Sequence, residues 1–204
     1  GVQVEEGQEV RVGKKVLTKT DKPVLLVLHK PRGIECTASK QVKNNIVDFI
    51  NYPCRVYPVG RLDMYSEGLL LLTNDGAAAN VLGHPSYEVD KEYLARIEGD
   101  RSRDFKRLEG PFTLDGKKVT AKVRLIRVQQ GENGKSASTL LSVTIDQGRN
   151  RQIRRMCALA DLPLRRLKRI REGELHLGDL APGTWRELNE NELAYIQKLK
   201  SKLQ

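Results

Sequence analysis

The amino-acid sequence predicts an α+β fold. Three observations support this: a length of 204 residues, a content of 39% hydrophobic and 30% charged residues, and a succession of short strands and helices. The length allows one domain of ordinary size, or one domain with a small appendage, and the apolar content suffices for a buried core. Strands and helices follow one another without the strict βαβ alternation of a doubly wound sheet, which favours α+β over α/β.

Several segments have the composition of β-strands. Each is a continuous apolar run or an alternation of apolar and polar residues, and most are bounded by Gly, Pro, Asn or Asp. Residues 69–73 form an apolar run before an Asn-Asp-Gly turn, which is typical of a strand buried on both faces. Strands are predicted at residues 24–28, 55–59, 69–73, 92–97, 119–128, 139–145, 164–170, 174–177 and 183–188.

Helices are predicted where apolar residues recur at intervals of three and four. The first follows Asn44 or Asn45, either of which can cap it, and ends before a proline. In residues 150–160 the apolar side chains share one helix face and three arginines share the other. Asn189 and Glu192 have the spacing of a capping box at the start of the last helix. The predicted helices comprise residues 45–51, 77–82, 102–108 and 150–160, and a last helix after Asn189.

The composition excludes several classes of protein. No apolar run approaches the roughly 18 residues of a membrane span, and no N-terminal segment has the pattern of a secretion signal. The three cysteines, Cys36, Cys54 and Cys157, form no Cys-x-x-Cys pair and are odd in number, which argues against a disulfide framework. The three histidines lie too far apart to indicate a metal site. These observations predict a reduced, cytoplasmic protein without a membrane segment or a bound metal.

The positive charge is concentrated in one segment. Residues 149–171 contain nine basic residues and one acid, Asp161, so +8 of the formal net charge of +10 lies there. Eight of the nine are arginines, whose planar guanidinium suits phosphate groups and base edges. A solvated helix face is the ordinary explanation of a charge run, but this run crosses a predicted helix, a turn and a strand. We therefore expect a polyanionic partner, with nucleic acid favoured over an acidic protein.

Residues 60–76, GRLDMYSEGLLLLTNDG, contain the strongest candidate for a catalytic group. Asp63 lies in a loop directly ahead of the apolar strand, and a rigid strand is a support on which catalytic carboxylates are often positioned. Taken alone, the tripeptide Arg61-Leu62-Asp63 is more simply explained by turn hydrogen bonds or by an Arg61–Asp63 pair. A catalytic assignment therefore depends on further motifs.

Further motifs occur in a fixed order. They are Lys30-Pro31-Arg32-Gly33, residues 60–76, KEYL from Lys91, QGRNRQIRRM from Gln147 and APGTWREL from Ala181. In sequence, order and spacing they resemble the RsuA/RluB/RluF family of ribosomal RNA pseudouridine synthases, over residues 24–188. QGRNRQIRRM and NNIVDFINY, at residues 44–52, are most similar to the RluF branch, which acts on large-subunit rRNA. The resemblance implies a mixed, largely antiparallel sheet flanked by helices, with an active-site cleft between two halves.

The resemblance implies catalytic roles for three residues. The family's essential aspartate falls on Asp63, the aromatic residue that packs on the target uracil on Tyr93, and the basic partner of the aspartate on Arg154. Isomerising uridine breaks the C–N glycosidic bond and rejoins uracil through C5 without redox change, so no metal or nucleotide cofactor is expected. Asp63 either attacks the sugar covalently or assists elimination to a glycal, and Tyr93 is a candidate for handling the C5 proton. Without the resemblance, Tyr93 would be a half-buried strand aromatic and Arg154 a solvated helix residue.

A target uridine must leave its stack to enter the cleft, at a cost of roughly a few kcal/mol. Arg61 is a candidate to fill the vacated stack or bind the backbone. The residues expected to bind RNA are Lys30, Arg32, Arg61, Arg149, Asn150, Arg151 and Arg155. The basic residues that could extend this track are Arg165, Arg166, Lys168, Arg169 and Arg171. Because alternate residues of a strand face opposite sides, only about half of these can touch one RNA surface.

The expected partner is ribosomal RNA or an assembling ribosomal particle, bound by a monomer. Residues 1–20 are expected to be the C-terminal remnant of a small N-terminal RNA-binding domain plus a linker, and residues 21–204 the catalytic domain. The main alternative is a non-catalytic rRNA-binding or ribosome-assembly protein with the same fold, which has no need of all three catalytic residues. A carboxylate-dependent hydrolase using Asp63, Glu67 and Asp75 is a weaker alternative, because no clustered ligand set accompanies them.

Overall fold

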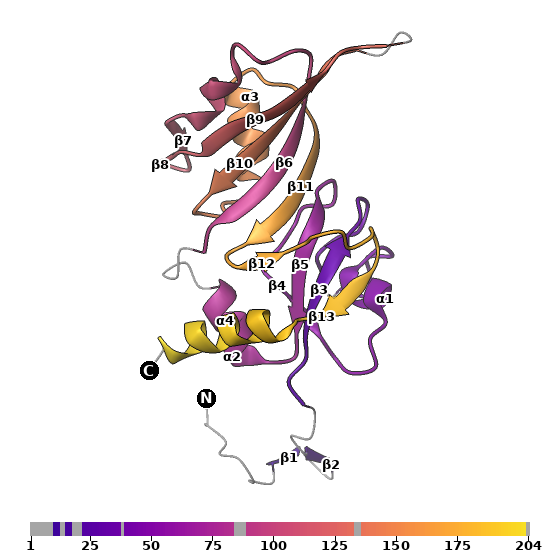
Figure 1. Cartoon of the computed structure of the whole chain (residues 1–204). Helices are drawn as coiled ribbons and strands as arrows, with labels where there is room; N and C mark the ends of the chain where they lie inside the picture. Colours follow the sequence, from indigo (N-terminus) through magenta and orange to yellow (C-terminus); the bar gives the residue numbers. More distant parts are fainter. Residues whose placement is uncertain are drawn as a thin grey trace.

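The computed structural model describes residues 10–12, 15–17, 22–37, 39–83, 89–132 and 136–202. Within these ranges the chain forms a nine-stranded mixed sheet flanked by helices, and two small antiparallel hairpins (Figure 1). The strands of the large sheet are β3 (Leu25–Lys30), β4 (Tyr57–Val59), β5 (Glu67–Thr73), β6 (Lys91–Glu98), β9 (Lys122–Gln129), β10 (Ser138–Ile145), β11 (Leu164–Glu172), β12 (Leu175–His176) and β13 (Trp185–Glu187). The helices are α1 (Ile46–Ile50), α2 (Gly76–Gly83), the 3-10 helix η2 (Phe105–Glu109), α3 (Gln152–Leu159) and α4 (Glu190–Ser201). The predicted α+β class is confirmed.

Two hairpins lie outside the large sheet. β1 (Val10–Val12) pairs with β2 (Lys15–Leu17). Both strands lie within residues 1–20, which were expected to be the remnant of an N-terminal RNA-binding domain plus a linker, and this division of the chain stays a prediction. β7 (Phe112–Leu114) pairs with β8 (Lys117–Val119). The strand predicted at residues 119–128 is confirmed as β9 from Lys122 onward, but its start differs: Val119 belongs to β8, and the chain turns before β9, where the Ala121 N–H donates to the Glu109 carbonyl.

The large sheet has the strand order β13-β3-β5-β11-β6-β10-β9, with β4 added on β5 and β12 on β11. All of its neighbouring strands are antiparallel except β5 and β11, which run parallel and pair at only two positions, Glu67 with Lys168 and Gly68 with Arg169. This short contact is the seam between two halves of the molecule, seen in Figure 1 where β11 meets β5. Because β5 and β11 pair at only two positions, the sheet divides there into the two predicted halves.

Gly68 allows the seam to close. Its φ is +109°, and a Cβ built on it would lie 2.1 Å from the carbonyl oxygen of Arg169. No real Cβ tolerates that distance, and L-residues rarely adopt that φ. A glycine is therefore required where the strand that follows Asp63 meets β11.

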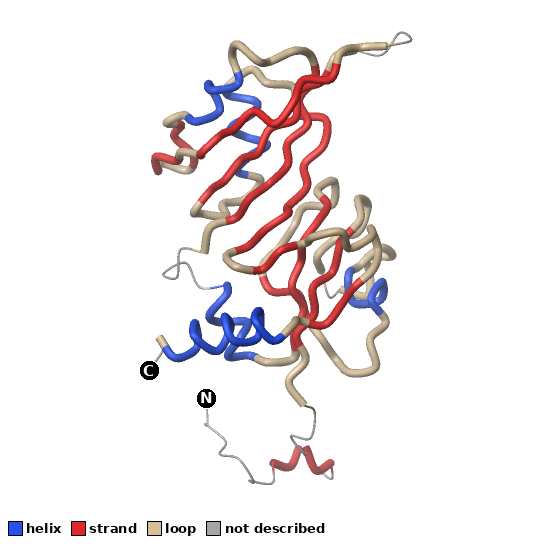
Figure 2. The backbone as a smooth tube through the Cα atoms, viewed as in Figure 1, coloured by secondary structure: helices blue, strands red, loops and turns tan. Residues whose placement is uncertain are grey.

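Two hydrophobic clusters cover opposite faces of the sheet. Leu70 and Leu72 of β5 join the cluster that includes α1 and α3, whereas Leu69 and Leu71 join the cluster under α2 and α4. Every residue of β5 is buried, which confirms the strand predicted to be buried on both faces. Figure 2 shows α2 and α4 together beside the lower half of the sheet, and α3 beside the upper half.

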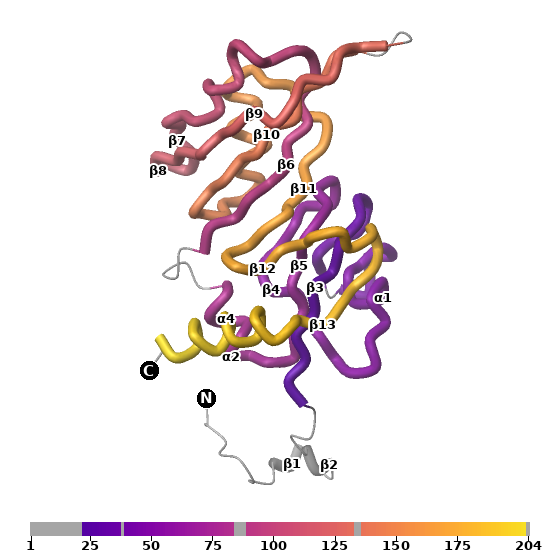
Figure 3. The backbone as a smooth tube through the Cα atoms, viewed as in Figure 1, coloured from indigo at the N-terminus to yellow at the C-terminus, as the bar shows by residue number. Residues whose placement is uncertain are grey.

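Helix ends follow the sequence signals. The side chain of Asn45 caps α1 by accepting the N–H of Asp48, and Asn189 with Glu192 forms the predicted capping box of α4. β3 and β13, from opposite ends of the chain, pair side by side (Figure 3), so α4, which follows the edge strand β13, packs in the same cluster as Val27 of β3. In the described ranges, every helix is too short or too polar to cross a membrane.

Candidate active site

Asp63 lies in the loop between β4 and β5, and this loop folds around its carboxylate. Oδ1 accepts the backbone N–H groups of Tyr65 and Ser66, each at 3.1 Å, and Oδ2 accepts the Ser66 hydroxyl at 2.6 Å. Aspartate commonly binds backbone N–H groups two and three residues ahead of it in such turns. The turn hydrogen bonds that explain a lone Arg-Leu-Asp are therefore present, and they fix the direction of the carboxylate.

The arginines that meet Asp63 come from the start of α3. Arg154 Nε is 3.1 Å from Asp63 Oδ2, and its Nη2 donates to the Ser66 hydroxyl at 3.0 Å. Arg151 Nη1 lies 3.7 Å from Asp63 Oδ1. The sequence placed Arg151 on the polar face of the helix, but in the structure Arg151 is the N-cap residue, with a left-handed φ of 48°. This backbone turn before α3 directs its side chain toward the Asp63 loop. The structure thus brings Arg154 to Asp63.

The surroundings of Asp63 favour its ionised form. Burial alone would raise the pKa of this carboxyl, but hydrogen bonds from Ser66 and Arg154, the charge of Arg154 and the Tyr65 N–H outweigh burial and hold the pKa below its usual range. At neutral pH Asp63 is therefore a carboxylate whose two oxygens are both oriented. A group in this state can act as a nucleophile or a general base.

Tyr93 lies on β6 and is 7% exposed, so it is more deeply buried than a half-buried strand aromatic. Burial raises the pKa of its phenol, and the positive charge of the Arg169 guanidinium opposes this effect. The hydroxyl is consequently protonated at neutral pH. The ring forms part of the wall of the cleft that also contains Asp63.

One cleft of about 900 Å³ contains this arrangement. Seven of the ten residues assigned to catalysis or RNA binding from the sequence line it: Arg61, Asp63, Tyr93, Arg149, Asn150, Arg151 and Arg154. They come from the loop before β5, from β6 and from the turn into α3, which belong to both halves of the sheet. The cleft expected between two halves is confirmed.

Three of the residues assigned to RNA binding lie elsewhere. Lys30 is fully buried, and its ammonium donates to the Pro31 carbonyl at 2.8 Å, so an RNA phosphate outside the protein cannot reach it; the structure contradicts that assignment. Burial lowers the pKa of Lys30, with Asp63 among the acids that oppose this effect. Arg155 points away from the cleft and binds both carboxylate oxygens of Asp115 at 2.9 Å. Arg32 is exposed on the turn after β3 and does not line the cleft.

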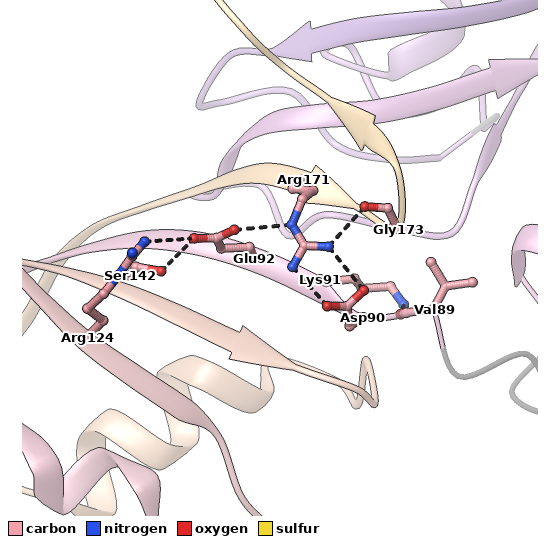
Figure 4. Close-up of polar contacts among 8 residues, drawn as sticks. All are labelled: Val89, Asp90, Lys91, Glu92, Arg124, Ser142, Arg171 and Gly173. Carbon is pink, nitrogen blue, oxygen red and sulfur yellow. Dashed lines mark hydrogen bonds and ion pairs between the residues drawn. The ribbon is translucent and has the colours of Figure 1, made fainter. Parts of the chain in front are cut away.

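Most of the basic run along β11 is neutralised by nearby acids. Arg165 pairs with Glu98, and the Arg166 guanidinium reaches both carboxylate oxygens of Glu67 at 2.9 Å. Arg171 bridges two acids, Glu92 at 3.1 Å and Asp90 at 2.8 Å, as Figure 4 shows. These ion pairs reduce the positive charge that β11 offers to RNA, and an RNA track along this strand stays a prediction. Apart from the buried Lys30, the basic residues expected to bind RNA that form no ion pair with a described residue are Arg32, Arg61, Arg149 and Lys168.

The family model described as RNA pseudouridylate synthase matches residues 24–159, which include the Asp63 loop, β6 and α3. The chain belongs to the RNA pseudouridylate synthase family. The enzyme is thus a pseudouridine synthase, an isomerase. This family membership supports the resemblance inferred from the motifs around Asp63 and α3.

Relatives match the enzyme over nearly its whole length. It is 38% identical over 204 residues to ribosomal large subunit pseudouridine synthase B of Bacillus subtilis, covering 98% of this chain and 81% of the relative. It is 35% identical over 202 residues to dual-specificity RNA pseudouridine synthase RluF of Escherichia coli K12, covering 98% of this chain and 67% of the relative. A crystal structure of a pseudouridylate synthase has a TM-score of 0.72 and 26% identity, covering 97% of this chain and 83% of that one.

Among the polar residues of the cleft, Ser66, Lys91 and Glu172 were given no role from the sequence, and Arg169 was considered only as a possible extension of the RNA track. Ser66 could have been found, because it follows Asp63 at the spacing of a side-chain turn. The sequence could not predict that Arg169 and Glu172 both face the cleft, because this depends on an irregularity of β11 that breaks the strand alternation. Among the described residues, no group of three or more His, Cys, Asp or Glu side chains is placed to hold a metal ion.

Proposed function

We propose that the enzyme converts a specific uridine of ribosomal RNA, in the large subunit, to pseudouridine. The bond between C1′ and N1 breaks, the uracil turns, a bond forms between C1′ and C5, and C5 loses a proton while N1 gains one. Atoms and electrons balance within the nucleotide. The rRNA substrate is supported by the names of the relatives from Bacillus subtilis and Escherichia coli.

The observation that carries this proposal is the ionised Asp63 opposite a buried Tyr93 in one cleft. We assign Asp63 the role of the carboxylate that promotes cleavage of the glycosidic bond. Tyr93 stacks on the uracil after the nucleotide has been flipped out of its helix, and keeps the detached base in place. Arg154 keeps Asp63 ionised and oriented, because a charge-assisted hydrogen bond is stronger than a neutral one.

Arg61, Arg149, Asn150 and Arg151 line the cleft and are assigned to the RNA backbone and the vacated stack. Arg151 has a second contact, with Asp63, and so links the RNA-binding rim to the catalytic carboxylate. Arg32, exposed on the turn beside the Asp63 loop, is a further phosphate contact: the N–H of its neighbour Gly33 donates to the Met64 carbonyl at 2.7 Å.

The deciding experiment is tritium release from rRNA labelled at uridine C5. Asp63→Asn is expected to lower the rate by at least about 100-fold, because the group that acts on the sugar is lost while the side chain keeps its size. Asp179→Asn is the matched control: Asp179 is exposed and outside the cleft, so its replacement should leave the rate unchanged.

Equal rates for the wild type and Asp63→Asn would overturn the role of Asp63. Binding of rRNA without any release by the wild type would favour a non-catalytic rRNA-binding protein. Sequencing of cellular rRNA for pseudouridine, with and without the gene, identifies the modified position, and an unchanged pattern in the large subunit would contradict the substrate.

A further inference from the structure

The wall of the cleft contains a cluster of four polar side chains, of which the proposed mechanism uses only Tyr93. On neighbouring antiparallel strands, Tyr93 of β6 is opposite Arg169 of β11, and Lys91 is opposite Glu172. Residues directly opposite in an antiparallel pair have their Cβ atoms close together and on the same face. All four line the cleft, so this face of the two strands presents a tyrosine and three charged groups to it.

An irregularity of β11 creates this cluster. The pairing of β11 with β6 shifts register between Arg169 and Arg171, so the strand contains an extra residue at that point. Without the shift, Arg169 and Arg171 would lie on the same face. With it, Arg169 faces the cleft, whereas Arg171 lies on the opposite face between Glu92 and Asp90 (Figure 4).

The cluster is deeply buried and only partly hydrogen-bonded. Arg169 is 2% and Glu172 3% exposed, and Arg169 Nη2 lies 3.6 Å from Glu172 Oε2. Neither of these two atoms has a hydrogen-bond partner among the described residues. Lys91 Nζ is 4.0 Å from Glu172 Oε1 and donates to the Val89 carbonyl at 2.8 Å. A buried ion pair of this kind is a weak source of stability compared with apolar side chains, so its presence calls for another explanation.

Arg169 also connects the strands that carry the two catalytic groups. Its backbone pairs with Gly68 at the seam, and its Nε donates to the Leu69 carbonyl at 2.8 Å. β5 carries the Asp63 loop at its start, and β6 carries Tyr93. One buried arginine therefore binds β5 through its Nε and stands directly opposite Tyr93 on β6.

We propose that Arg169 and Glu172 are positioning residues that set the placement of the Tyr93 ring relative to Asp63 across the β5–β11 seam. Glu172 neutralises and orients the guanidinium, and Lys91 orients Glu172 from the other side. Neither residue of the pair touches the substrate. The inference deepens the proposed function, on which its kinetic part rests, whereas the placement of Tyr93 is measured without turnover.

The placement is measured by NMR on protein labelled with ¹³C at the tyrosine Cζ, with the Tyr93 resonance assigned by its loss in Tyr93→Phe. We expect Arg169→Met and Glu172→Gln each to shift the Tyr93 resonance at neutral pH, because both change the charges that act on Tyr93. Arg165→Met and Glu98→Gln are matched controls: this ion pair joins the same two strands but is exposed to solvent. An unmoved Tyr93 resonance in both cluster variants would overturn the proposal, whether or not the wild type is active.

A double substitution separates positioning from stability. Replacing one member of a buried ion pair is destabilising, whereas replacing both by apolar residues of similar size is often neutral or stabilising. Arg169→Met/Glu172→Met should therefore recover the melting temperature that a single substitution loses. If the pair positions Tyr93, kcat for tritium release stays lower than wild type by about 10-fold while KM changes by less than about 2-fold.

Recovery of both melting temperature and kcat in the double variant would show that the pair contributes only stability, and would overturn the proposal. If Arg169→Met does not fold, Glu172→Gln and the double variant provide the same comparison. A wild-type enzyme that releases no tritium, with the Tyr93 resonance still shifted by the substitutions, would contradict the proposed function but leave the positioning role standing.

Discussion

Asp63 and Arg154 are 91 residues apart in the sequence, yet Arg154 Nε lies 3.1 Å from Asp63 Oδ2. The Ser66 hydroxyl completes a triangle with them, donating to Asp63 at 2.6 Å and accepting from Arg154 at 3.0 Å. The two carboxylate oxygens therefore have different environments: Oδ1 faces backbone N–H groups, and Oδ2 faces the side chains of Ser66 and Arg154. The hydrogen bonds of Arg154 to Asp63 and Ser66 thus connect α3, in one half of the molecule, to the Asp63 loop in the other.

Replacing Arg154 should change the pH dependence of the reaction. In the proposed mechanism the ionised form of Asp63 is the active one, and because its pKa is depressed we expect activity to persist as pH falls until the folded-state pKa is reached. In Arg154→Met the pKa of Asp63 rises, and the acid limb of the kcat profile should move to higher pH. Arg155→Met is the control, since Arg155 pairs with Asp115 outside the cleft. An acid limb at the same pH in both variants would contradict the role of Arg154.

Ser66→Ala should lower both stability and activity. The hydroxyl is buried and makes two hydrogen bonds, so its loss should reduce the free energy of unfolding by about 1–2 kcal/mol, as measured by urea denaturation. Ser201→Ala removes an exposed hydroxyl at the end of α4 and should change stability by less than about 0.5 kcal/mol. Identical effects of the two substitutions would show that the bridge to Asp63 contributes nothing.

Gly68→Ala should be among the most destabilising substitutions. The new methyl group would meet the Arg169 carbonyl at 2.1 Å, and the strand cannot move away without opening the seam. We expect a loss of about 3 kcal/mol or more in the free energy of unfolding. Gly178→Ala is the control, because its φ is also positive, +60°, but no atom lies within 4 Å of the built Cβ; it should cost about 1 kcal/mol. Equal losses would mean that the close approach is unimportant.

The salt dependence of rRNA binding should separate free from paired arginines. Arg61 is exposed at the cleft without an ion pair to any described residue, and Arg61→Gln should reduce the slope of log K against log salt by about one. Arg165→Gln should leave the slope nearly unchanged, because Arg165 is already paired with Glu98. If Arg165→Gln lowers the slope as much as Arg61→Gln, the ion pairs of β11 open when RNA binds.

Local sequence patterns predicted much of the fold. The capping box of Asn189 and Glu192, the Asn45 cap and the doubly buried β5 are short-range features, and the structure contains all three. Each depends on interactions within one element or on its apolar periodicity, which residues close in sequence specify. The start of the strand predicted at residues 119–128 was misplaced by three residues, because the hydrogen bond between Ala121 and Glu109 that turns the chain depends on η2.

The sequence by itself determined which chemistry is present: an aspartate in a strand-supported loop, a tyrosine on a strand and a basic helix, in the order of one enzyme family. Only the tertiary structure decided which charges are available to do that chemistry. Arg154 meets Asp63, Arg166 is neutralised by Glu67 across 99 residues, and the register shift on β11 turns Arg169 inward and Arg171 outward. The physical reason is that ion pairing and strand register depend on partners distant in the chain. A +8 segment therefore indicates a polyanion without showing which arginines are free to touch it.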